Sequence, residues 1–79
     1  ATLITDIQHD GARRTVRGVS HDDGSIATVS VNGHPATITT QHSGVADWTI
    51  TIDAPADGRF TAKATDLVGN AECMPHQVP

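Results

Sequence analysis

The sequence predicts an all-β fold, an antiparallel β-sandwich of about seven short strands. Apolar and polar residues alternate with a period of two along most of the chain, which is typical of half-buried strands. Thr, Val and Ile dominate these segments, and all three favour strands. Gly and Pro divide the chain into segments of strand length at intervals of roughly ten residues, as in many sandwiches. No stretch keeps helical spacing of apolar residues, so no helix longer than one turn is expected.

The first two strands are expected at Leu3–Ile7 and Arg13–Val19, on either side of the turn His9-Asp10-Gly11. Val16 is predicted to face inward. Gly18 interrupts the alternation of the second strand, which indicates a bulge or a close approach of another backbone.

The third strand is expected at Ser25–Val31, with one face formed by Ala27, Val29 and Val31 and the other by Ile26, Thr28 and Ser30. Asn32-Gly33 follows directly and is a strong hairpin signal. The hairpin partner is therefore expected at Ala36–Thr40, with Ile38 inward.

Three further strands complete the prediction. Asp47–Asp53 alternates without a break, and its predicted inner face consists of Trp48, Ile50 and Ile52. Arg59–Asp66 follows a wide turn that contains Pro55, and its predicted inner face consists of Phe60, Ala62 and Ala64. The last strand is expected around Glu72–Val78, at an edge or in an irregular tail, because it contains Pro75. Polar outer faces are expected from Thr49, Thr51, Thr61 and Thr65.

Composition limits both size and function. The 79 residues suffice for one small domain with a thin core, since Leu, Ile, Val and Phe make up only 16 of them. Five Lys and Arg against nine Asp and Glu disfavour nucleic acid or an anionic membrane as partner, and no apolar run approaches the length of a membrane span. The single Cys73 excludes an internal disulfide framework. We interpret it as a buried apolar residue, with a disulfide to a cysteine elsewhere in a parent chain or a free reactive thiol as alternatives.

An ordered set of motifs resembles a known family. The motifs are Val16-Arg17-Gly18, Asp22-Asp23-Gly24, Val29-Ser30-Val31-Asn32-Gly33, Trp48 and Ala62-Lys63-Ala64-Thr65-Asp66-Leu67-Val68-Gly69-Asn70. This set is similar to the bacterial immunoglobulin-like domains of secreted and cell-surface proteins, including the glucodextranase domain-B-like group, and it covers about residues 12–75.

The resemblance implies a seven-stranded immunoglobulin-like sandwich without an inter-sheet disulfide. It also implies one domain over residues 1–79, part of a larger exported bacterial protein at the cell surface or outside the cell. Members act as spacers, stabilising domains or adhesive modules, so neighbouring domains of the parent chain are the expected partners. Tyr is absent, which rules out a tyrosine-corner bond. We assign structural roles to Gly18, Val29, Val31, Asn32, Gly33, Trp48, Ile50, Phe60, Asp66, Gly69 and Asn70.

No motif for catalysis is found. The chain contains no Gly-x-Ser-x-Gly elbow, no phosphate-binding Gly loop and no His-Glu-x-x-His, so we expect neither an enzyme nor a cofactor. Five histidines fall in predicted turns or the tail, and we expect them to be solvated rather than metal ligands: His9, His21, His34, His42 and His76. His9 and His21 flank one strand and would meet at one end of the sandwich only with help from other loops.

Calcium and sugars are the remaining ligand hypotheses. The calcium candidates are Asp22, Asp23, Asp66 and Asn70, although calcium needs six to eight oxygens and each Asp is better explained by its own turn. Sugar platforms need exposed aromatics, whereas both aromatic residues are predicted to face the core. The competing hypothesis is a carbohydrate- or protein-binding module attached to a secreted glycan-active enzyme, which would bind through Asp22, Asp23, His34 and His42.

Overall fold

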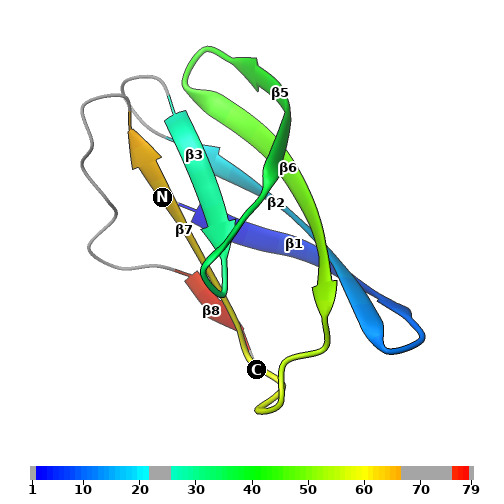
Figure 1. The fold of residues 1–79 in the computed structure, drawn as a ribbon. Coiled ribbons are helices and arrows are strands. Elements are labelled where there is room, and N and C mark those ends of the chain that lie inside the picture. The colour runs from blue at the N-terminus through cyan, green and yellow to red at the C-terminus, as the bar shows by residue number, and fades with distance from the viewer. Residues whose placement is uncertain (1, 22–25, 67–75, 79) are drawn as a thin grey trace.

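The fold is a two-layer antiparallel β-sandwich, as predicted (Figure 1). The structure is a computed structural model and describes residues 2–21, 26–66 and 76–78. Sheet A has the order β1-β2-β6-β5, with β1 at Thr2–Asp10, β2 at Arg13–His21, β6 at Val45–Asp53 and β5 at Thr37–His42. Sheet B has the order β4-β3-β7-β8, with β4 at His34–Pro35, β3 at Ile26–Val31, β7 at Phe60–Asp66 and β8 at His76–Val78. The described residues contain no helix.

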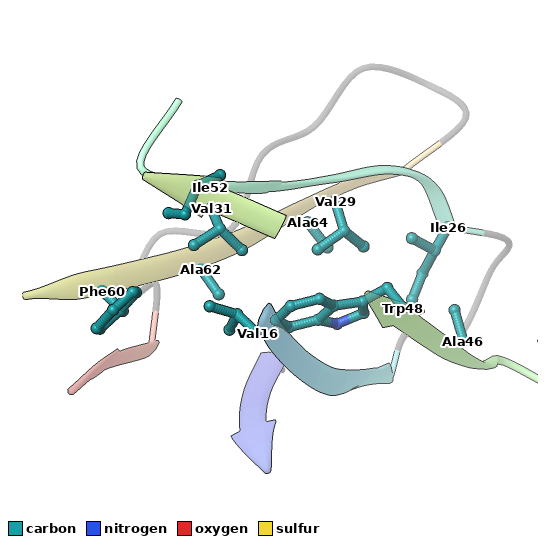
Figure 2. Packing of buried hydrophobic residues seen from close by; sticks show 10 residues of the cluster. All are labelled: Val16, Ile26, Val29, Val31, Ala46, Trp48, Ile52, Phe60, Ala62 and Ala64. Carbon is teal, nitrogen blue, oxygen red and sulfur yellow. The ribbon is translucent and has the colours of Figure 1, made fainter. Parts of the chain in front are cut away.

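The core lies between the sheets and is built around the chain's one Trp (Figure 2). Trp48 is 2% exposed, and the inward positions predicted for Val16, Ile52, Phe60, Ala62 and Ala64 are confirmed by their burial. Ile50 is half-buried and packs against this cluster. The small side chains of β7 leave room for the indole, which explains how a chain with so few large apolar residues still closes a core.

Gly18 makes the close approach that its sequence position predicts. It pairs with Trp48 across β2 and β6. A Cβ at this position would overlap both the Trp48 ring and the carbonyl oxygen of Leu3. Glycine is therefore required because the indole and the backbone of β1 occupy the space that any side chain would need.

Both edges of sheet A carry a bulge. The register of β1 skips Thr5, and the register of β5 skips Thr39. The Thr5 hydroxyl donates to the carbonyl of Arg17 at 3.3 Å, and the Thr39 hydroxyl donates to the carbonyl of Asp47 at 3.2 Å. Each bulged threonine thus hydrogen-bonds to the neighbouring inner strand. Bulges also increase local twist and protect an edge strand from pairing with another chain.

The inner face of β3 differs from the prediction. Ile26 is buried and Ala27 is exposed, whereas alternation placed Ala27 on the same face as Val29 and Val31, both of which are buried. The register shifts by one residue between Ile26 and Thr28, so Ala27 is the extra residue of a bulge. A strict period of two fails at such a residue because the bulge turns every earlier side chain to the other face.

The predicted partner of β3 is also wrong. Asn32 and Gly33 form the expected tight turn, with φ values of 52° and 83°, but the hairpin partner of β3 is only the two-residue strand β4. The Ala36 N–H still donates to the Val29 carbonyl at 2.7 Å. Beyond Ala36 the chain crosses to sheet A, where it forms β5 and pairs with β6. Pro35 has no N–H to extend the hairpin ladder. Ile38 still packs against the core, because it lies opposite Trp48.

Candidate functional site

The Asn32 side chain has a structural role that sequence reasoning missed. Its Nδ2 donates to the Arg59 carbonyl at 3.0 Å, and its Oδ1 accepts from the Thr61 N–H at 2.8 Å. The Asn32 N–H also donates to the Thr61 carbonyl at 2.9 Å. The residue thus ties the β3–β4 hairpin to the start of β7. An Asn-Gly pair predicts the turn, but it carries no signal for this second, long-range function.

The calcium candidates fall mostly outside the described residues. Asp22, Asp23 and Asn70 all lie there, as do Gly69, to which we assign a structural role, and Cys73. Asp66 is described only as the last residue of β7, paired with Ile26. The calcium hypothesis therefore remains a prediction.

The histidines are distributed over both ends of the sandwich. His9 lies near Phe60, whereas His21 pairs with Val45 at the far end of sheet A. His42 also pairs with Val45, and His34 lies in β4 at the same end as Phe60. The structure therefore separates His9 from His21 and His34 from His42. Within the described ranges, no three His, Cys, Asp or Glu side chains gather as a metal site would require.

Neither aromatic side chain offers a sugar platform. Trp48 is 2% exposed and Phe60 is 6% exposed, so both rings belong to the core. The indole Nε1 is buried and has no hydrogen-bond acceptor among the described residues. Stacking on a pyranose ring needs a ring face open to solvent.

No described segment forms a helix with the length and hydropathy of a membrane span.

The outer face of sheet A is hollowed between its two bulges. The hollow measures about 400 Å³ and is lined by Thr5, Arg17, Gly18, Val19, Thr39, Asp47, Trp48 and Thr49. The Thr40 hydroxyl donates to Asp47 Oδ2 at 2.7 Å, so this carboxylate is already engaged. The surface is shallow, and its acidic group Asp47 is already hydrogen-bonded, which makes it a poor ligand site.

A second hollow, which we call the end cleft, lies between the β1–β2 hairpin, the connection from β6 to β7 and the first residue of β7. It measures about 300 Å³ and is lined by Ile7, His9, Arg14, Ala54, Pro55, Gly58 and Phe60. Ile7, Phe60 and Pro55 make its walls mainly apolar. A largely apolar hollow with a few polar groups is the usual form of a binding site.

Arg14 is the charged group of the end cleft. The residue is partly exposed, and its Nη1 donates to the carbonyls of Gly11 at 2.9 Å and Arg13 at 2.8 Å, two exposed hydrogen bonds that orient the guanidinium. His9 lies directly opposite Arg14 in the β1–β2 register. The neighbouring Arg13 faces the other side of the sheet, where its Nε lies 3.5 Å from Asp53 Oδ1.

The end cleft was missed in the sequence, although the signal was present. Alternation places Val16 inward, and the same alternation places Arg14 on the inner face two residues earlier. An arginine on the core side of a strand therefore indicates that the strand extends beyond the opposite sheet.

Comparisons with protein-family models, with curated proteins and with solved structures found no match for this chain.

Proposed function

We propose that this chain is a non-catalytic immunoglobulin-like accessory module of an exported bacterial protein, a spacer that holds neighbouring domains apart. The order of strands supports the immunoglobulin-like assignment. Taking β1, β2, β6 and β5 as one layer and β3, β7 and β8 as the other gives the arrangement typical of that fold. In this scheme β4 and β5 belong to one segment that passes from one sheet to the other.

The observation that carries the spacer role is the separation of the two chain ends. Thr2 pairs with Ser20, which in turn pairs with Ala46, at one end of the sandwich. Val78 pairs with Phe60, at the other end (Figures 1 and 2). The longest dimension of the molecule is 36 Å. A domain whose chain enters at one end and leaves at the other is suited to connection in series.

Interactions at the entry end favour a fixed orientation. The Thr2 side chain is buried, and its hydroxyl lies 2.9 Å from the hydroxyl of Ser20, which is also buried. At the other end, the Ala54 N–H donates to the carbonyl of Ala12 at 2.9 Å and links β6 to the β1–β2 turn. A buried hydrogen bond beside the first strand residue resists fraying, which a spacer under load requires.

The test places the chain between two labelled reporter domains and measures the distribution of distances between them. A flexible Gly-Ser linker of the same 79 residues is the matched control, and it spans about 50 Å root mean square with a broad distribution. A rigid module predicts one narrow peak. A distribution as broad as that of the linker would contradict the spacer role.

The alternative is a binding module. Its sugar-binding form loses support because both aromatic side chains are buried. Its protein-binding form is favoured by one observation, the end cleft with Arg14 on its inner side. Glycan-array and pull-down measurements on the isolated chain separate the two forms from each other.

A further inference from the structure

The end cleft combines three properties. It is hollow, its walls are mainly apolar, and its charged groups are basic. Among the described residues that line it, none is acidic, although the whole chain carries a formal net charge of −4. A basic hollow in an acidic protein attracts negatively charged groups selectively.

The guanidinium of Arg14 has hydrogen-bond donors available for a carboxylate. The described residues give it no carboxylate partner, in contrast to Arg13 with Asp53. Its two hydrogen bonds to backbone carbonyls both use Nη1, so Nη2 and Nε keep donors that no described contact uses. A fixed guanidinium loses little entropy when it binds a carboxylate, and the planar fork matches that group in geometry.

The surroundings favour a single negative charge over a polyanion. Arg14 is the one charged side chain among the described lining residues, with His counted as neutral, so the cleft offers a single cation, whereas a phosphate chain or a nucleic acid is held by several. The apolar walls formed by Ile7 and Phe60 instead fit a large apolar side chain. A volume of about 300 Å³ is at the lower limit of ligand pockets and accommodates one such side chain beside a carboxylate.

We propose that the end cleft binds a polypeptide segment in which a Glu or Asp is adjacent to a large apolar residue. Arg14 pairs with the carboxylate, and Ile7, Pro55 and Phe60 contact the apolar side chain. The edge strand β8 pairs with the first residues of β7, and its Val78 lies opposite Phe60, which lines the cleft. The inference depends on the cleft alone and not on the spacer role.

The test is a titration of the ¹⁵N-labelled chain with three blocked dipeptides, followed by NMR. Acetyl-Phe-Glu-amide is the probe, and acetyl-Phe-Gln-amide and acetyl-Ala-Glu-amide remove the charge and the apolar group in turn. We expect saturable shifts at the amides of Ile7, Gly58 and Phe60 and at Arg14 Nε–H. The first peptide should bind about tenfold more tightly than either control, as expected for a charge-assisted hydrogen bond and a buried ring.

Two arginine variants test whether Arg14 causes the preference for the peptide that contains Glu. Arg14→Gln should abolish the preference for Glu over Gln, whereas Arg13→Gln should leave it unchanged. Equal binding of the first two peptides to the wild-type chain would overturn the proposal, and this comparison holds even if Arg14→Gln fails to fold. Shifts confined to other regions, equal effects of the two variants, or stronger binding of inorganic phosphate at the same amides would overturn it as well.

Discussion

One added methyl group at Gly18 should destabilise this domain more than one added at Gly11, Gly33 or Gly58. The Cβ of Gly18→Ala would overlap the Leu3 carbonyl oxygen, which belongs to the backbone of β1, and the six-membered ring of Trp48. Neither neighbour can move freely, since one is held in the β1–β2 ladder and the other is 2% exposed. Overpacking of a filled core costs about 1–3 kcal/mol, and the backbone clash places this variant at the upper end of that range.

Chemical denaturation of the wild type and two variants measures the effect. Gly11→Ala is the matched control, because a Cβ there meets nothing within 4 Å. Its φ of 62° makes alanine unfavourable by about 1–2 kcal/mol through strain alone, whereas the Gly18 variant adds only a steric clash. We expect Gly18→Ala to lose about 3 kcal/mol and to change the near-ultraviolet circular dichroism of Trp48. Unchanged stability and an unchanged spectrum would refute the packing described for sheet A.

Three further predictions concern stability. Asn32→Gly keeps the positive φ but removes the side-chain hydrogen bonds to β7, so the free energy of unfolding should fall by about 1–2 kcal/mol in urea denaturation; no loss would contradict the link between hairpin and β7. Arg13→Gln should change stability by less than about 0.5 kcal/mol in the same assay, because the ion pair with Asp53 is exposed; a larger, salt-sensitive loss would contradict this. Trp48→Ala should cost about 3–5 kcal/mol, and an unchanged melting temperature would show that the core is not built around this residue.

The fold class was predictable because most strands obey a period of two. β6 and β7 alternate without interruption, so their inner faces could be assigned residue by residue. Alternation failed at Ala27, where one extra residue reverses the faces and no Gly or Pro marks the position. A bulge of this kind can form without a characteristic residue at its position, so sequence patterns carry almost no signal for it.

The change of sheet between β4 and β5 could not be predicted from local pattern either. Asn32-Gly33 specifies a hairpin, and the hairpin forms, but only two residues long. Its end depends on Pro35, and the new partner of Thr37 is Thr49, a residue twelve positions further along the chain. Pairing of this kind depends on contacts that are distant in sequence, such as that of Ile38 with Trp48 opposite it on the neighbouring strand, and not on local pattern.

The candidate site was partly accessible to the same reasoning. Alternation from Val16 places Arg14 on the inner side of β2, and alternation from Ile7 places His9 on the inner side of β1. The sequence does not show how far the opposite sheet extends. This extent decides whether the side chains of Arg14 and His9 contact the core or lie at an open end. It depends on where β7 begins, after the turn that contains Pro55.

The accessibility of Trp48 tests the central claim, a closed two-sheet core, most directly. The chain has one Trp, so its fluorescence reports on this position alone. With 2% of the residue exposed, the folded protein should emit at short wavelength and resist quenching by acrylamide, and urea should remove both properties together. Emission at long wavelength that is readily quenched in the folded protein would contradict the account.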